Sequence, residues 1–135
     1  ILGEAGVNMS AFTVAENSDF GILRLIVSDT DTAIKVLRDR LYAVSVADVV
    51  CLHCPNQPGA LAKAMDIITS AGIFIEYMYA FSQGEAANVI IRPDNVEKCA
   101  EVLKADELEV IAASDLTLSA SFICWKTLTL RAKSM

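Results

Sequence analysis

The sequence predicts an α+β fold in which one folding unit, with the element order β-α-β-β-α-β, occurs twice in tandem. The chain has 135 residues, and short segments recur at a constant offset of 66 positions: Ala5-Gly6-Val7 as Ala71-Gly72-Ile73, and Val36-Leu37 as Val102-Leu103. Strand-like and helix-like patterns follow one another in the same order between these matches. An offset that holds without a gap indicates duplication of a single structural unit.

The second copy, residues 49–116, holds every expected element, beginning with an apolar strand from Asp48 to Cys54. A short loop leads to Pro58, where we expect a helix to begin, because the first helical residue needs no free N–H. The apolar stripe of this helix has helical spacing, and Gly72 is expected to end it. The stripe consists of Leu61, Ala64, Met65 and Ile68.

The rest of the second copy reads as a hairpin, a helix and a final strand. Alternating residues predict a strand over 73–81, a turn at 82–85 and a returning strand over 87–92. A helix then starts near Pro93-Asp94, with Val96, Cys99, Ala100 and Leu103 on one face, and residues 108–113 form the last strand.

The first copy, residues 1–48, has the same parts from its middle onward. Strands are expected over 7–14 and 20–27, then a helix capped by Asp29 or Asp31, then a strand from Tyr42 to Val50. The inward face of the helix is expected to carry Ile34, Leu37 and Leu41. Subtracting the offset places the first strand and most of the first helix before Ile1. We therefore expect a fragment whose first unit has a gap in its sheet, with unpaired ladder groups that something must fill.

Residues 117–135 have no counterpart in either copy and form a C-terminal extension of unknown role. Apolar and polar residues alternate from Phe122 to Arg131, which is typical of one strand. The favoured interpretation is a frayed extension. The alternative is that this segment inserts where the first strand is absent.

Composition and charge exclude several classes of function. The net charge is −6, and all 17 acidic residues lie before residue 117, against 8 basic ones there. An acidic body opposes binding to nucleic acid, which needs a positive patch. No apolar run is long enough to span a membrane, and the first residues lack the basic-then-apolar pattern of a signal peptide, so we expect neither secretion nor membrane insertion. The four cysteines have no framework spacing, so we expect a reducing, cytoplasmic environment.

The loop after the first strand of the second copy has the chemistry of an anion site. Gly59 at a helix start leaves free N–H groups and the positive end of the helix dipole facing one spot, which suits a carboxylate. The Asn56 amide can both donate and accept, so it can hold the two charged groups of an amino acid. The simpler interpretation is that Asn56 caps the helix and Gly59 avoids a clash.

The run Asn56-Gln57-Pro58-Gly59-Ala60-Leu61, with Ala71-Gly72-Ile73 at the helix end, resembles the ACT domain family of amino-acid-sensing modules. Most of the chain is similar to a small stand-alone protein of two tandem ACT domains, the first incomplete. The resemblance implies a ferredoxin-like fold that pairs sheet to sheet and binds an amino acid between two copies. It also implies no catalytic activity and no cofactor.

A second family pattern occurs at Gly6-Val7-Asn8-Met9, where the family places an Asn at the pairing interface. The second copy has Phe74 at the matching position. The resemblance therefore implies one composite site, formed by Asn56, Gln57, Pro58, Gly59, Ala60 and Leu61 with Asn8. Serine-sensing members often carry His two residues before the loop Asn, and Cys54 stands there in this chain.

Three other interpretations compete with amino acid sensing. Cys51 and Cys54 have a CxxC spacing that can hold a soft metal ion, but an offset of three positions along a strand turns the two sulfurs to opposite faces. Catalysis has little support, because the single His has no nucleophile at a recognisable spacing. A structural dimerisation module without ligand is the third. A homo-oligomer and a metabolic enzyme are the expected protein partners.

Overall fold

The structure is a computed structural model that describes residues 1–16, 19–111 and 125–133. The chain forms two compact units. Unit 1 comprises Ile1–Ala47 with the C-terminal residues from Lys126 onward, and unit 2 comprises Asp48–Trp125. Strand β3 (Ala43–Pro55) begins in unit 1 and continues into unit 2, so the two strands expected around residues 42–54 are one. No helix in the described part of the chain is long and apolar enough to cross a membrane.

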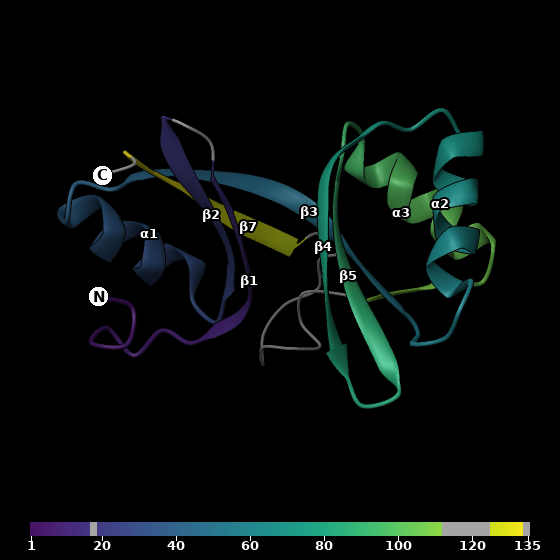
Figure 1. The fold of residues 1–135 in the computed structure, drawn as a ribbon, viewed down its shortest axis with the longest axis horizontal. Helices are drawn as coiled ribbons and strands as arrows, with labels where there is room; N and C mark the ends of the chain where they lie inside the picture. Colours follow the sequence, from purple (N-terminus) through teal and green to yellow (C-terminus); the bar gives the residue numbers. More distant parts are fainter. Residues whose placement is uncertain (17–18, 112–124, 134–135) are drawn as a thin grey trace. The chain divides into compact units, whose positions relative to one another are not determined.

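Unit 2 has the element order that the sequence predicts. After β3 come α2 (Ala60–Ser70), β4 (Ile75–Gln83), β5 (Ala86–Pro93), α3 (Val96–Ala105) and β6 (Glu109–Ile111). The strands lie in the order β6-β3-β5-β4, with antiparallel neighbours. Both helices lie on one face of this sheet (Figure 1).

The core of unit 2 lies between that sheet face and the two helices. Its members alternate along the strands and recur at helical spacing on α2 and α3: Val50, Leu52, Cys54, Ala64, Ile68, Ile73, Val89, Ile91, Cys99, Ala100 and Leu103. Of the predicted stripe on α2, Ala64 and Ile68 are fully buried, whereas Leu61 is exposed. The inward face of the helix is therefore narrower at its first turn than the sequence pattern predicts.

Unit 1 completes its sheet with the C-terminal strand. Its elements are β1 (Met9–Glu16), β2 (Phe20–Val27), α1 (Thr30–Asp39), the first part of β3, and β7 (Trp125–Lys133). The strand order is β1-β2-β7-β3, and β7 runs antiparallel to β2 from Leu25↔Leu128 to Phe20↔Lys133. Strand β7 thus takes the place in unit 1 that the second part of β3 takes in unit 2.

The interpretation of the C-terminal extension as frayed is therefore wrong for residues 125–133, and the alternative of insertion is confirmed for them. Residues 117–124 lie outside the described part. The apolar face of β7 joins the core of unit 1, which also includes residues of β2 and α1: Val7, Leu25, Val27, Ala33, Leu37, Leu128 and Leu130. Thr127 is fully buried and its Oγ1 donates to the Leu25 carbonyl at 3.3 Å.

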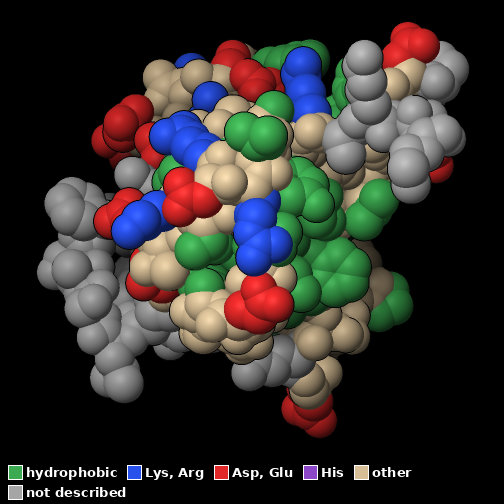
Figure 2. Space-filling model, turned by 90° about the vertical axis from the view of Figure 1, so that its left-hand side faces the viewer, with side chains coloured by type: hydrophobic (Ala, Val, Ile, Leu, Met, Phe, Trp, Pro, Cys, Tyr) green, Lys and Arg blue, Asp and Glu red, His purple; other side chains and the backbone are tan. Residues whose placement is uncertain are grey.

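Strand β1 of unit 1 exposes large apolar side chains to solvent. Phe12 is 63% exposed and Val14 67%. They lie opposite Leu25 and Leu23 on β2, so they belong to the sheet face that α1 covers only in part. Figure 2 views the molecule from the side of α1 and shows hydrophobic side chains at that surface beside charged ones.

The duplication extends to the details of the backbone. Several special features recur at the offset of 66: positive φ at Gly6 (71°) and Gly72 (69°) and at Leu41 (65°) and Glu107 (60°), and a strand irregularity at Met9/Ala11 and Ile75/Tyr77. Helix caps recur as well, because Asp29 caps α1 and Asn95 caps α3. These matches confirm that one folding unit occurs twice.

Leu41 does not face the core as expected, because it is 95% exposed. Helix α1 ends at Asp39, with Arg40 as its C-cap. Leu41 follows in the left-handed conformation, which turns the chain away from the helix axis before β3 begins. A helical spacing beyond the true end of the helix therefore misplaces this residue.

Candidate functional site

The candidate site is the loop that joins β3 to α2 in unit 2. Helix α2 begins at Ala60 and not at Pro58, with Gly59 as its N-cap at φ 88°. Two turn bonds precede the helix: the Gln57 N–H donates to the Pro55 carbonyl at 2.9 Å, and the Ala60 N–H donates to the Gln57 carbonyl at 3.2 Å. A fixed proline φ suits such a turn as well as a first helical turn, which explains why the expected start was two residues early.

Asn56 does not cap α2. Its backbone N–H donates to the Glu85 carbonyl at 2.9 Å, which ties the loop to the β4–β5 turn, and the residue is exposed. Helix α2 has no side-chain cap, whereas Asp29 accepts from Thr32 N–H on α1 and Asn95 accepts from Lys98 N–H on α3. The capping interpretation of Asn56 is therefore wrong, and its amide is exposed for another use.

The start of α2 keeps its positive potential. Helix geometry leaves the N–H groups of Leu61 and Ala62 without an intrahelical acceptor. The first turns of α1 and α3 contain Asp31 and Glu97, whereas that of α2 contains no acidic residue. Among the described helices, α2 is thus the one whose N-terminus has neither a side-chain cap nor a carboxylate of its own. Such an end attracts an anion.

Gly59 is required by its backbone and not by a close neighbour. A Cβ built on Gly59 would meet no atom within 4 Å, so the space beside it is open. The expectation that Gly59 avoids a clash is therefore wrong. Its φ of 88° lies in the region that L-residues rarely adopt. This conformation starts the helix directly after the turn, with its first N–H groups accessible.

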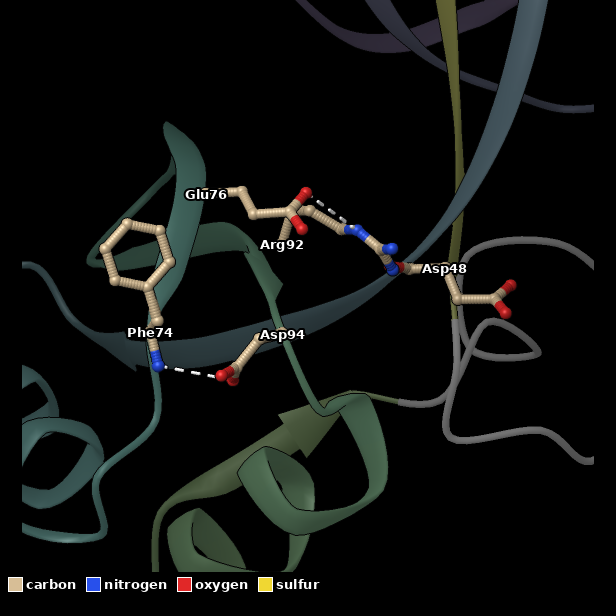
Figure 3. A network of polar contacts seen from close by, with 5 residues as sticks. All are labelled: Asp48, Phe74, Glu76, Arg92 and Asp94. Atoms are coloured by element: carbon tan, nitrogen blue, oxygen red, sulfur yellow. Dashed lines mark hydrogen bonds and ion pairs between the residues drawn. The ribbon is translucent and has the colours of Figure 1, made fainter.

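Asn8 lies in unit 1, where two hydrogen bonds join it to Ser28; we call this pair of bonds a bracket. Its N–H donates to Ser28 Oγ at 3.0 Å, and the Ser28 N–H donates to its carbonyl at 2.9 Å. The same pair of bonds occurs 66 positions on. The Phe74 N–H donates to Asp94 Oδ1 at 3.2 Å (Figure 3), and the Asp94 N–H donates to the Phe74 carbonyl at 2.9 Å. Equivalent backbones therefore present an exposed Asn in one unit and a Phe that is 68% exposed in the other.

Asn56 and residues 57–61 form one continuous segment of unit 2, made of the loop and the first two residues of α2. Asn8 belongs to unit 1. Their combination in one site stays a prediction.

The three cysteines in the described part of the chain, Cys51, Cys54 and Cys99, are buried. Cys54 packs in the core of unit 2, whereas Cys51 is buried outside that cluster, as expected for alternate faces of β3. Burial raises the pKa of Cys51 to about 12 and also raises the pKa of Cys54. Since a metal binds the thiolate, these shifts oppose a soft-metal site. No group of three or more His, Cys, Asp or Glu that could hold a metal occurs among the described residues.

His53 has a structural partner that sequence reasoning missed. Its Nδ1 lies 2.7 Å from Oδ1 of Asn88, which is 1% exposed on the neighbouring strand β5. The two residues are directly opposite in the ladder. This pairing depends on strand register, which the residue types alone do not reveal.

A second missed feature is a polar network on β4 and β5. Arg92 contacts Glu76 and the carbonyl of Asp48 (Figure 3). A signal was present in the sequence, because the first copy has Ile26 at the position of Arg92 and Ser10 at that of Glu76.

The two α+β units with matching backbones define a duplicated module. Residues 1–120 match the family described as ACT domain pair. The chain belongs to the ACT domain family, whose members have regulatory, small-molecule-binding roles.

One solved structure with close similarity is the crystal structure of protein BT0572 from Bacteroides thetaiotaomicron. The two chains are 54% identical with a TM-score of 0.81, and the match covers 85% of this chain and 80% of that one. A search of curated proteins gave no significant match.

Proposed function

We propose that this protein is a non-catalytic regulator that binds a small amino acid between its two ACT modules. Asn56, the backbone of residues 57–61 and Asn8 are the proposed contacts. The observation that carries the proposal is the start of α2, which has no side-chain cap and no acidic residue in its first turn. The first module, completed by β7, supplies Asn8 to this site.

The loop offers a distinct partner to each charged group of an amino acid. The N–H groups of Leu61 and Ala62 would donate to the carboxylate, which the positive end of α2 also attracts. A helix terminus contributes about 0.3–1 kcal/mol to such an interaction, and up to about 2 kcal/mol where water is partly excluded. The amide oxygen of Asn56 can accept from the ammonium group. Asn8 would add a second amide from the other module.

Binding at a junction of modules can carry a signal. A ligand shifts an equilibrium between two packings only by its difference in affinity for them. A ligand that contacts both modules has such a difference, because it loses contacts when the modules separate. A metabolic enzyme is the proposed recipient of this signal, a homo-oligomer the proposed assembly and the cytoplasm the proposed location.

The test is thermal unfolding against each common amino acid, for the wild type and three variants. A ligand at 100 times its dissociation constant adds about 2.7 kcal/mol to stability. One amino acid should raise the melting temperature of the wild type. The rise should disappear in Asn56→Ala and in Asn56→Asp, whose charge repels the carboxylate. It should persist in Gln57→Ala, because only the backbone of Gln57 is used.

A pairing module without ligand is the second candidate, and the exposed side chains of β1 favour it. Strand β1 ends the strand order of unit 1, and Phe12 and Val14 are largely in solvent. An apolar edge strand is a template for pairing with another chain. If no amino acid raises the melting temperature while the protein dimerises through β1, this second function replaces the first.

A further inference from the structure

The two copies differ most clearly in polarity near the end of β5 in unit 2 and of the matching strand β2 in unit 1. Arg92 is 26% exposed at its side chain, and its Nε lies 3.3 Å from Glu76 Oε2. Its Nη1 donates to the carbonyl oxygen of Asp48 at 2.7 Å (Figure 3). The first copy has Ile26 and Ser10 at the matching positions, so it cannot form this network. The network is therefore a property of unit 2 alone.

The ladder between β3 and β5 explains why a side chain is needed there. Its last pair toward unit 1 is Val50↔Ile91, and the same register continued by two residues would set Asp48 opposite Pro93. Proline has no N–H to donate, so the ladder cannot continue through this pair. The Arg92 guanidinium supplies the donor that Pro93 lacks, and it does so at the first residue of unit 2.

Glu76 gives this donor a fixed direction. The guanidinium is planar and presents its N–H groups as a rigid fork, so a carboxylate bound at Nε fixes the direction of Nη1. A lysine ammonium has no such plane and is a flexible point charge. The Asp48 carbonyl is thus bound by the Arg92 guanidinium, which Glu76 in turn keeps in one orientation. Asp48 lies where β3 passes from one module to the next.

We propose that Arg92 is a positioning residue that restrains the segment of β3 joining the two ACT modules. The consequence for ligand binding rests on the proposed function, because Asn56 and Asn8 must meet in one arrangement. Restraint of the joining segment lowers the conformational freedom that binding would otherwise remove. The restraint itself requires no ligand, so it can be measured separately.

The experiment measures distances between the modules by pulsed electron spin resonance. Spin labels are placed at Lys35→Cys on α1 and Glu101→Cys on α3, both exposed positions, with Cys124 replaced by serine. Cys51, Cys54 and Cys99 are buried and their pKa values are raised, so they should resist labelling. The label pair is measured in the wild-type background and with Arg92→Met, Arg92→Lys, Glu76→Gln and Arg40→Met, without added amino acid.

Arg92→Met keeps the aliphatic stem and removes every donor, so the distance distribution should broaden. Arg92→Lys should restore part of the restraint, and Glu76→Gln should broaden the distribution although Arg92 is present. Arg40→Met is the matched control, because Arg40 forms an exposed ion pair with Glu4 at 3.5 Å within unit 1, and it should change nothing. A wild-type distribution in Arg92→Met, at an unchanged melting temperature, overturns the inference.

A second readout separates the two proposals. In the amino acid panel, Arg92→Met should weaken binding of the responding amino acid about tenfold, which corresponds to 1.4 kcal/mol. If the wild type responds to no amino acid, the proposed function fails and the distance measurement still decides the role of Arg92. If an amino acid binds both proteins equally and the distances agree, only the inference about Arg92 fails.

Discussion

Replacing Leu128 by alanine is the most direct test of how unit 1 is completed. Leu128 is fully buried on β7, directly opposite Leu25, and both belong to the core of unit 1. Truncating a buried leucine to alanine costs about 2–5 kcal/mol, from lost transfer energy and the cavity left behind. A small protein is stable by only about 5–15 kcal/mol in total, so this loss should be large.

The assay is urea unfolding of Leu128→Ala beside Thr129→Ala, followed by far-ultraviolet circular dichroism. Thr129 is the next residue of β7 and only half-buried on the opposite face, so its truncation should cost well under the leucine value. The reasoning is refuted if Leu128→Ala lies within about 0.5 kcal/mol of the wild type, the range of ordinary surface substitutions. That result would mean that β7 does not fill the sheet of unit 1.

Three further predictions follow from single residues. Gly59→Ala should destabilise the protein by about 1–2 kcal/mol, because an alanine there would have to adopt a positive φ. Gly21→Ala is the control, since Gly21 has equally open space and no positive φ, and urea unfolding should show no such loss of stability. Hydrogen bonds from Thr32 lower the pKa of Asp29 below 3.8, so its contribution to folding stability is present above that pH and is lost as the pH falls below it. An Asn at this position still caps the helix but does not titrate, so Asp29→Asn should make the melting temperature depend less on pH in the acid range. Burial raises the pKa of Cys51 from 9.0 to about 12, so stability should fall as pH rises through that window, and Cys51→Ala should reduce the slope of the alkaline limb under reducing conditions.

The sequence was sufficient for the parts of the fold that depend on local patterns. The duplication, the element order of unit 2 and the hairpin of unit 1 all follow from repeats, alternation and turn residues. Asp29 was one of two expected caps for α1, and the structure selects it because its side chain accepts from the Thr32 N–H. Sequence spacing specifies these features because their partners lie within a few residues.

The features that sequence analysis missed depend on distant pairing or on the ends of helices. Thr127 and Leu25 are 102 positions apart, and alternation alone cannot say which strand a terminal segment will join. Leu41 kept a helical spacing beyond the last helical residue. Pro58 fits a turn as well as a helix start, so only the hydrogen bonds of the loop decide between them.

The candidate loop was predictable as a segment but not in its chemistry. Its residue types suggest a carboxylate site, yet Asn56 is equally typical of a helix cap. Only the geometry shows that α2 lacks a side-chain cap while the other two described helices have one. The network of Arg92 was visible only as a difference between the copies, and its contact with the Asp48 carbonyl required the register of β3 and β5.

Because the two units repeat the same backbone, a side chain of one unit can be tested at the matching position of the other. Residues 8 and 74 sit in the same hydrogen-bonded bracket, so Asn8→Phe and Phe74→Asn each place a side chain where the duplicate already accepts it. Such swaps show the effect of the side chain itself, because the backbone at each position already accommodates the new residue type in the other unit. The chain thus records two outcomes of one ancestral position, and either can be rewritten into the other to learn what the divergence changed.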